Sequence, residues 1–383
     1  MLLSKGLEVE IYTGKPDGQI VGLADQIVAQ LDGFVREPDS RNVEYTTAPF
    51  TNYERLLCAL VKPRLQLREY LKTLGDYTLI PGSTLSLGDS SRFYRSDPAN
   101  PYHTYIEQTY GTKVVTASIH INIGIADPEI LMQALRLIRL EAPLYLALSA
   151  ASPFLDGQAT GYHSSRWAVF PPTPAFVPLF TSHAHFIQWT EEQLTLGTMQ
   201  NVRHLWCSVR PNGDRRPYNL NRLELRICDL VTNPIAQLAI VAFLEARIHQ
   251  LLANPDLDPL KSSTLNFANQ SEELINLTTA NEALAARSSL DAQLRHWQDG
   301  RTITARDWIG EIYEEIWPYA KKLGFSCFLS PLQKILREGN TAQKWLKHQA
   351  KGLSIAQIIE AAILETREQE EELSDKLCQT INF

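Results

Sequence analysis

The chain has 383 residues, of which 44% are hydrophobic and 21% are charged, and its formal net charge is -7 at pH 7. This length and apolar content can form a large buried core, in one big domain or in two smaller ones. The negative charge and the lack of a basic run argue against nucleic acid or an anionic membrane as the main partner. We therefore expect a soluble globular protein.

The N-terminal segment does not resemble a signal peptide. Lys5, Glu8 and Glu10 interrupt the first ten residues, where a signal peptide needs a continuous apolar core. No long uncharged apolar stretch typical of a membrane span stands out elsewhere in the sequence. We therefore expect a cytoplasmic protein.

The cysteines are scattered and form no Cys-x-x-Cys pair, so neither a zinc knuckle nor a disulfide framework is predicted. We expect reduced, mostly buried thiols at Cys58, Cys207, Cys228, Cys327 and Cys378. His183 and His185, two residues apart, resemble half of a zinc site, but the sequence places no third ligand with them. Zinc is therefore disfavoured.

In chain order, the first part of the protein alternates short strand-like runs with breaks rich in Pro, Gly, Asn and Asp. The expected strands cover residues 7–12, 43–47, 116–125, 204–210 and 222–229. Helices are expected over 19–31 and 127–140, the second with Asp127 as cap and Pro128 at the first helical position.

The pattern changes near Thr232, after which long helical periods predominate. Helices are expected over 234–253, 271–297, 304–323 and 354–377. Residues 304–307 and 354–357 read as capping-box-like starts, and Pro318 should kink or end the third helix. We expect a sheet region over 1–232 and a helical region packed on it over 233–383.

The most informative segment covers residues 6–10, where Glu8 and Glu10 alternate with the aliphatic Leu7 and Val9. Successive side chains of a strand point to opposite faces, so the two carboxylates share one face. Two like charges side by side either face solvent as a hydrated edge or share a cation. In a cleft, the natural cation is a hard divalent metal such as Mg²⁺.

Other expected strands repeat this separation of polar and aliphatic faces. The polar faces combine Ser118, His120 and Asn122 in one strand, Glu44 and Thr46 in another, Glu224 and Arg226 in a third, and His204, Ser208 and Arg210 in a fourth. The turn before Glu44 adds Glu37 or Asp39. Such a set suits Mg²⁺ and phosphate. The chain has neither a P-loop nor a Gly-x-Gly-x-x-Gly turn, so phosphate must be held by metals and arginines.

Taken in order, five motifs resemble those of the carboxylate-amine ligases, and specifically of glutamate-cysteine ligase of the cyanobacterial type. They lie at residues 6–10, 43–45, 120–122, 152–154 and 224–226. The resemblance implies an α+β fold similar to the catalytic core of glutamine synthetase, with a curved, mainly antiparallel sheet, and a C-terminal helical region. It also implies that ATP phosphorylates the side-chain carboxylate of glutamate, after which the cysteine amine displaces phosphate. This reaction is the first step of glutathione synthesis.

Carried over motif by motif, the resemblance implies metal ligands at Glu8, Glu10, Glu44, His120 and Glu224. Carboxylates spread over several strands suggest more than one Mg²⁺ ion, and either Glu37 or Asp39 of the acidic turn could reach one of them. It implies that Arg226 meets the phosphoryl group, with Asn122 also at the cofactor. Arg210 resembles a further arginine of the family, and Arg166 could bind the glutamate α-carboxylate or a phosphate.

Each assignment has a structural alternative. Glu8 and Glu10 could form a hydrated edge, Glu224 and Arg226 a structural ion pair, His120 a buried core residue, residues 37–40 a plain turn, Arg166 and Arg210 solvent-facing arginines, and residues 82–88 a connector rather than a mobile substrate loop. Two other functions also stay open. One is a related ligase that joins glutamate to another amine, and the other is a noncatalytic protein that binds a metal or an amino acid. The sequence fixes neither the oligomeric state, nor the general base, nor redox control.

Overall fold

The structure is a computed structural model that describes residues 1–265 and 269–380. Within them, the main sheet has seven strands in the order β2-β3-β1-β5-β9-β8, with β4 paired to β1. Every pair of neighbours is antiparallel. The strands are β1 (Lys5–Gly14), β2 (Phe34–Arg36), β3 (Asn42–Thr46), β4 (Thr78–Ile80), β5 (Ile119–Gly124), β8 (Val209–Asn212) and β9 (Arg222–Leu225). Two small sheets pair β6 (Phe154–Leu155) with β7 (Gln158–Ala159) and β10 (Gln293–Arg295) with β11 (Thr302–Thr304).

Helices make up most of the remaining structure. They are α1 (Ala24–Gln30), α2 (Tyr53–Leu74), α3 (Pro101–Tyr110), α4 (Pro128–Ser149), α5 (Ser165–Val169), α6 (His183–Leu196), α7 (Pro234–Ala253), α8 (Pro259–Ser262), α9 (Gln270–Ser288), α10 (Ala305–Leu323), α11 (Ser326–Leu329), α12 (Leu332–Glu338), α13 (Thr341–Ala350) and α14 (Ile355–Thr380). Short 3₁₀ turns cover Gly111–Val114, Pro255–Leu257 and Ser289–Asp291. The expected α+β class with a mainly antiparallel sheet is confirmed.

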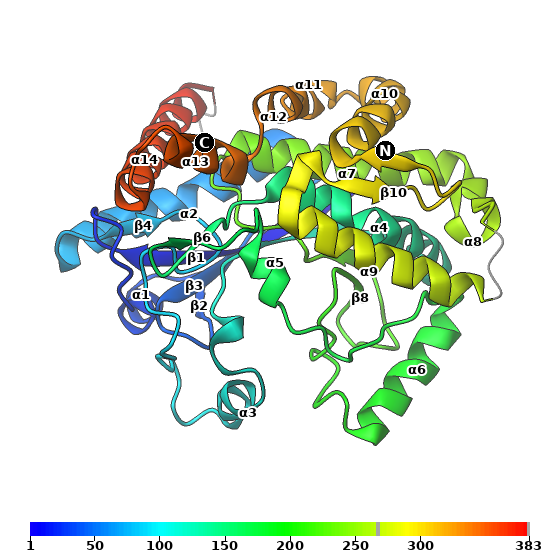
Figure 1. Ribbon diagram of the computed structural model, residues 1–383, viewed down its shortest axis with the longest axis horizontal. Coiled ribbons are helices and arrows are strands. Elements are labelled where there is room, and N and C mark those ends of the chain that lie inside the picture. The colour runs from blue at the N-terminus through cyan, green and yellow to red at the C-terminus, as the bar shows by residue number, and fades with distance from the viewer. Residues whose placement is uncertain (266–268, 381–383) are drawn as a thin grey trace.

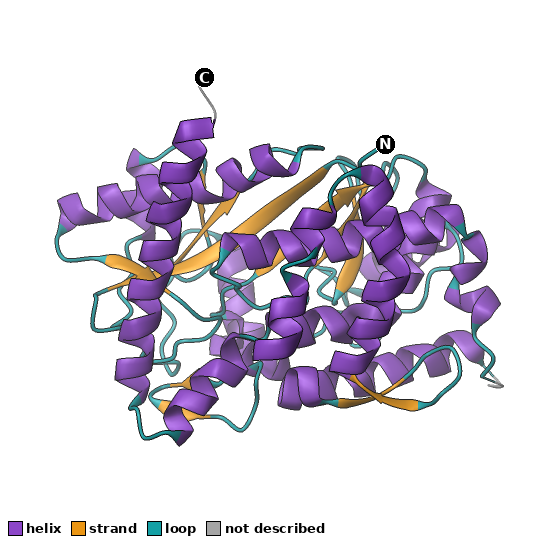
Figure 2. Ribbon diagram, turned by 90° about the horizontal axis from the view of Figure 1, so that it is seen from above, coloured by secondary structure: helices purple, strands orange, loops and turns teal. Residues whose placement is uncertain are grey.

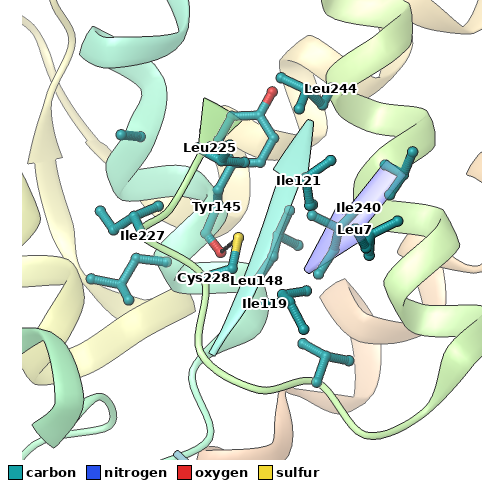
Figure 3. Packing of buried hydrophobic residues seen from close by; sticks show 14 of the residues in the cluster. Leu7, Ile119, Ile121, Tyr145, Leu148, Leu225, Ile227, Cys228, Ile240 and Leu244 are labelled. Atoms are coloured by element: carbon teal, nitrogen blue, oxygen red, sulfur yellow. Dashed lines mark hydrogen bonds between the residues drawn. The ribbon is translucent and has the colours of Figure 1, made fainter. Parts of the chain in front are cut away.

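The aliphatic face of the sheet packs against helices. Leu7, Ile121 and Leu225, from three adjacent strands, are fully buried against side chains of α4 and α7 (Figure 3). Figure 1 shows α2, α4 and α7 on this side of the sheet, with α10 to α14 beyond them and with α3 and α6 on the other side. Seen from above in Figure 2, the helices lie across the strands. The opposite, polar face of the sheet is thereby left for the site.

Helix α7 is apolar on all sides because it is a core helix. Among the described residues it is the one helix long and apolar enough to cross a membrane, by length and composition alone, although Glu245 and Arg247 interrupt it. Inside the protein, 72% of its apolar window is buried.

Several expected elements are confirmed with their caps. The helix expected over 234–253 is α7. Thr304 caps α10 by accepting a hydrogen bond from the backbone N–H of Asp307 at 3.0 Å. Ser354 and Gln357 form the expected capping box ahead of α14, with hydrogen bonds of 3.2 and 2.9 Å. These helix starts could be predicted because a capping hydrogen bond joins residues only three positions apart in the sequence.

Three expected strands are shorter in the structure than their sequence patterns predict. The strand expected over 204–210 begins only with β8, because the preceding segment turns into an aromatic cluster where His204 is hydrogen-bonded to Tyr110 at 2.9 Å. Likewise, the strand expected over 222–229 ends with β9, and the one expected over 116–125 begins with β5. Periodicity alone does not show where a strand loses its neighbour.

Helix ends also differ from expectation. The helix expected over 271–297 ends before Ser289, whose φ of 45° turns the chain toward β10. The helix expected over 127–140 continues through Pro143 to the end of α4, because burial of that turn offsets the hydrogen bond that proline removes. Similarly, α10 continues past Pro318, which does not end it. Helices α2, α3 and α6 were not predicted. The division of the chain at residue 232 stays a prediction.

The cysteines are less uniformly buried than expected. Cys207 and Cys228 are buried, Cys58 is partly buried and Cys327 is exposed. The side chain of Cys378 lies outside the described residues.

Candidate active site

The polar face of the sheet brings acidic residues directly opposite one another. In the antiparallel register, Glu10 of β1 lies opposite Glu44 of β3, and Glu8 lies opposite His120 of β5. Opposed residues of an antiparallel pair have Cβ atoms about 4.5–5.5 Å apart. The repulsive pair predicted within one strand is therefore part of a larger patch, with carboxylates on β1 and β3 and His120 on β5.

The same face continues over the next two strands. Asn122 of β5 lies opposite Glu224 of β9, and Glu224 lies opposite Arg210 of β8. Residues from β1, β3, β5, β8 and β9, together with α3 and loops, line a cavity of about 750 Å³. We call it the sheet cavity. A separate cavity of about 440 Å³ lies among α7, α12, α13 and α14, away from these side chains.

Glu8, His120 and Glu224 form one group, which we call the histidine cluster. Their potential ligand atoms all lie within 4.8 Å of one another. His120 Nδ1 lies 3.0 Å from Glu8 Oε2, and Asn122 Nδ2 donates to Glu8 Oε1 at 3.1 Å. Burial works to raise the pKa of Glu8, but the hydrogen bond with His120 and the charge of Arg226 lower it overall. Glu8 is thus held as a carboxylate by its neighbours.

Glu224 is fully buried and has the strongest compensation. Arg210 donates to both of its oxygens, at 2.7 and 2.9 Å, and Asn212 Nδ2 donates to Oε2 at 2.7 Å. Arg226 also pairs with Glu224. Burial opposes its ionisation, but Arg210, Arg226 and His120 hold the pKa of Glu224 well below its usual range. The ion pair with Glu224, which Arg226 shares with Arg210, therefore holds Arg226 beside the histidine cluster.

Glu10, Glu37 and Glu44 form a second group, the carboxylate cluster, with oxygens within 4.8 Å of one another. Burial, reinforced by the charges of Glu8 and Glu10, raises the pKa of Glu44 to about 8. Burial and the charges of Glu10 and Glu44 raise the pKa of Glu37 well above its usual range. Within the described part of the chain, no lysine or arginine forms an ion pair with these three carboxylates.

The donor chemistry of both clusters fits hard divalent cations. Carboxylate oxygens are the ligands that Mg²⁺ prefers, and buried carboxylates that repel one another gain most from a shared cation. His120 is a less usual ligand for Mg²⁺, and its ring already contacts Glu8 through Nδ1 and Ser118 through Nε2 at 3.0 Å. A positioning role for His120 is thus as compatible with its contacts as a ligand role.

The acidic turn contributes Glu37 and not Asp39 to this group. Asp39 accepts two hydrogen bonds of 2.8 Å from the guanidinium of Arg41 and one of 2.9 Å from the backbone N–H of Tyr94. The loop over 82–88 is mostly buried, and its Ser83 hydroxyl accepts the backbone N–H of Leu230. That loop does not line the sheet cavity, which favours the connector reading.

The arginines do not face bulk solvent. Arg166 of α5 is 3% exposed and donates to the backbone carbonyls of Arg226 and Ile227 at 3.0 and 3.1 Å. Arg210 is also buried, and beyond Glu224 its partners among the described residues are the backbone carbonyls of Arg203 and Leu205. Both line the sheet cavity. Arg166 has the freer guanidinium of the two, whereas Arg210 is largely committed to Glu224.

The histidine pair of α6 has other partners. His183 Nε2 donates to the carbonyl of Pro217 at 2.8 Å, and His185 Nδ1 lies 3.2 Å from the Thr181 hydroxyl. Neither belongs to a potential metal-binding group among the described residues.

Sequence reasoning missed several polar residues of the site, among them Asn212 and Arg216. Asn212 lies two residues after Arg210, so a strand extended by two residues would have placed it on the same face. Arg216 lies in the loop after β8 and also lines the sheet cavity. No periodic signal marks it, because loop side chains have no fixed alternation. A wall of aromatic residues, Tyr102, Phe170 and Trp206, completes the lining.

Comparison with known proteins places the chain in a family. The sequence profile of glutamate-cysteine ligase family 2 (GCS2) matches residues 4–379 of this chain. A protein of Sorangium cellulosum, provisionally named glutamate-cysteine ligase 2, is 29% identical over 64% of this chain and 62% of its own length. A provisionally named glutamate-cysteine ligase 2 of Solibacter usitatus is 30% identical over 65% and 62%. The chain thus spans less than two thirds of either relative.

Two solved structures share the fold. The glutamate-cysteine ligase of Francisella tularensis, in complex with AMP, has a TM-score of 0.69 and 13% identity, over 99% of this chain and 93% of that one. A bifunctional glutathione synthetase of Pasteurella multocida has a TM-score of 0.72 and 14% identity, over 97% and 53%. At such low identity these likenesses establish the fold alone. Since the family match spans nearly the whole sequence, the protein belongs to glutamate-cysteine ligase family 2.

Proposed function

We propose that the protein is an ATP-dependent glutamate-cysteine ligase. It would join the γ-carboxylate of glutamate to the amine of cysteine through a γ-glutamyl phosphate, the first step of glutathione synthesis. The observation that carries the proposal is the meeting of two acidic clusters and several arginines at one cavity of about 750 Å³, which all cluster members except the fully buried Glu224 line directly. The AMP bound by the Francisella tularensis ligase supports an adenine nucleotide as the phosphoryl donor.

The two clusters are the proposed places for Mg²⁺. Glu10, Glu37 and Glu44 would hold one ion, and Glu8 and Glu224, with His120, would hold another. When bound, such cations neutralise phosphate charge and polarise the phosphoryl group.

The residues of the chain then act on anionic reactants. In the first half-reaction, an oxygen of the glutamate γ-carboxylate attacks the γ-phosphorus of ATP, and ADP leaves with the bridging oxygen. Arg226, fixed by Glu224, is placed to stabilise the charge on the transferring phosphoryl group. In the second, the neutral amine attacks the acyl carbon, inorganic phosphate leaves and one proton is lost. Arg166 would bind the α-carboxylate of glutamate through its guanidinium.

The test is a turnover assay. Purified protein is incubated with ATP, Mg²⁺ and glutamate, with cysteine, with other single amino acids or with none, and ADP is measured. The proposal predicts the fastest ADP release with cysteine. A faster rate with another amine would identify a related ligase, and no ADP with any acceptor would leave only a binding function.

A variant ties the activity to the paired-carboxylate strand. Glu10→Gln should abolish turnover at ordinary Mg²⁺ without unfolding the chain, because it removes one charged ligand from the carboxylate cluster. Glu69→Gln is the matched control, since Glu69 is exposed, forms an ion pair with the exposed Lys72 and does not line the sheet cavity. Unchanged turnover in Glu10→Gln would contradict the metal assignment.

A further inference from the structure

Three arginines of the sheet cavity keep a buried guanidinium nitrogen that has no hydrogen-bond partner among the described residues. These atoms are Nε of Arg166, Nη1 of Arg216 and Nε of Arg226. A buried donor without a partner costs about 1–3 kcal/mol, and more when it is charged. Such donors gathered around one cavity indicate an anionic ligand. Sequence reasoning singled out Arg166 and Arg226 but had no reason to choose Arg216.

Arg216 is held at the cavity by the loop that joins β8 to β9. That loop is anchored on α6, at the lower right of Figure 1, where His183 Nε2 donates to the carbonyl of Pro217 at 2.8 Å. Tyr218 adds a hydrogen bond of 2.7 Å from its hydroxyl to Glu191 of α6. Arg215, the preceding residue, is exposed and does not line the cavity. The loop therefore distinguishes two adjacent arginines, one turned to the cavity and one to solvent.

The surroundings of Arg216 carry an excess of positive charge. Arg203, Arg210 and Arg226 line the same cavity, and the charge of each acts on Arg216. The buried carboxylate among them is Glu224, which Arg210 and Arg226 already bind. Burial and the neighbouring Arg210 lower the pKa of Arg216 to about 10, so it stays charged at neutral pH. A single carboxylate ligand would leave much of this charge unmatched, whereas a polyphosphate would match it.

We propose that Arg216 binds the polyphosphate chain of the nucleotide, together with Arg226 and opposite the carboxylate cluster. This assignment rests on the proposed function and adds a residue to it. The cavity then has two ends of opposite charge: carboxylates on β1 and β3, and guanidiniums on β8, β9 and the loop between them. A guanidinium suits the second end because its fork of donors fits phosphate oxygens in pairs.

The test compares nucleotide binding by wild type, Arg216→Gln, Arg216→Lys and Arg215→Gln. Dissociation constants of AMP, ADP and ATP are measured by calorimetry with Mg²⁺. Arg216→Gln should weaken ADP and ATP binding by about 10- to 100-fold, the effect of losing a charge-assisted hydrogen bond. AMP binding should change much less. Arg216→Lys should restore part of the loss, because it returns the charge without the fork. Arg215→Gln should bind every nucleotide as wild type does.

The outcomes separate this inference from the proposed function. If wild type turns over and Arg216→Gln binds ATP as tightly as wild type, the role of Arg216 is wrong and the ligase stands. A rise confined to the KM of glutamate would likewise overturn it, by reassigning Arg216 to a carboxylate. Equal losses for AMP and ATP would show a general disturbance of the cavity and not a polyphosphate contact. Absence of nucleotide binding and of turnover in wild type would refute both proposals. Thermal unfolding of each variant verifies that the loop has not been destabilised.

Discussion

The two acidic clusters of the sheet cavity share strand β1 but differ in how their charge is balanced. In the histidine cluster, Arg210, Arg226 and His120 surround Glu224, and the pKa of that carboxyl falls well below its usual range. In the carboxylate cluster no lysine or arginine of the described residues forms an ion pair, the more distant charge of Arg226 offsets little, and the pKa of Glu44 rises to about 8. One cluster is compensated by the protein itself. The other is left to a proton or a bound cation for most of its compensation.

This difference separates a preformed part of the site from a part that a ligand completes. Compensated charges cost little to keep in place and hold Arg226 rigidly, as electrostatic preorganisation requires. Uncompensated carboxylates store repulsion that cation binding releases. Three changes should show whether the two clusters behave in these opposite ways.

The largest effect is expected for Glu224→Gln. Losing this charge leaves the guanidiniums of Arg210 and Arg226 buried without a counter-ion, so the free energy of unfolding should fall by about 3–5 kcal/mol. Urea unfolding measures it. Asp214→Asn is the control, because Asp214 forms an exposed pair with Arg222 at 3.8 Å, and such pairs contribute about 0–1 kcal/mol. Equal stability of the two variants would show that Glu224 is not the counter-ion that the geometry indicates.

Removing the charge of Glu44 should stabilise the fold at high pH, whereas removing that of Glu224 should destabilise it. Its pKa of about 8 lies above the ordinary value of 4.5, so at intermediate pH the folded protein holds a proton that the unfolded chain has lost. Stability without metal should therefore decline as pH rises between these two values. Glu44→Gln should weaken this dependence and melt about 2–4 °C higher than wild type near pH 8.5 in chelator. Because Mg²⁺ competes with the proton, wild-type affinity for Mg²⁺ should increase with pH up to about 8. A melting profile of Glu44→Gln parallel to that of wild type would argue against an uncompensated cluster.

The smallest effect is expected at Ser118, whose hydroxyl contacts both clusters. The Ser118 hydroxyl donates to Glu10 Oε2 at 2.7 Å and lies 3.0 Å from His120 Nε2. Ser118→Ala removes the hydrogen bond to Glu10, which contributes about 1 kcal/mol, together with the contact to His120, so kcat/KM should fall about fivefold or somewhat more with the fold intact. Ser91→Ala, at an exposed hydroxyl that contacts Asp89, should leave it unchanged. Complete inactivation would mean that Ser118 takes part in the chemistry directly.

Which side chains share the polar face could be predicted, because alternation along a strand is local. Glu8 and Glu10 in β1 and His120 and Asn122 in β5 lie on the face that their spacing indicated. The capped starts of α4, α10 and α14 were local in the same sense. Register between strands is not local, so the direct opposition of Glu10 and Glu44 emerged only from the structure.

What sequence reasoning missed depends on tertiary contacts. Turn geometry sends Glu37 to the site and Asp39 to Arg41, although the two residues are near neighbours. His204 fits the alternation of a strand, yet it packs against Tyr110 outside the sheet. Helix α2 escaped because Pro63 interrupts its pattern, while burial of its apolar stripe keeps it helical.

A last consequence concerns the order in which the fold can be completed. Arg64 and Arg68 of α2 are buried, and both pair with Glu370 of α14, which lies 302 residues after Arg68. A buried guanidinium without its counter-ion is strongly destabilising. During synthesis on the ribosome, α2 is made long before Glu370, which neutralises its two buried arginines. Contacts between residues so distant along the chain also form slowly. Helix α2, which packs against β1 on the aliphatic face of the sheet, should thus reach its native position late in folding. The polar face of the sheet should become rigid only when α14 packs against α2.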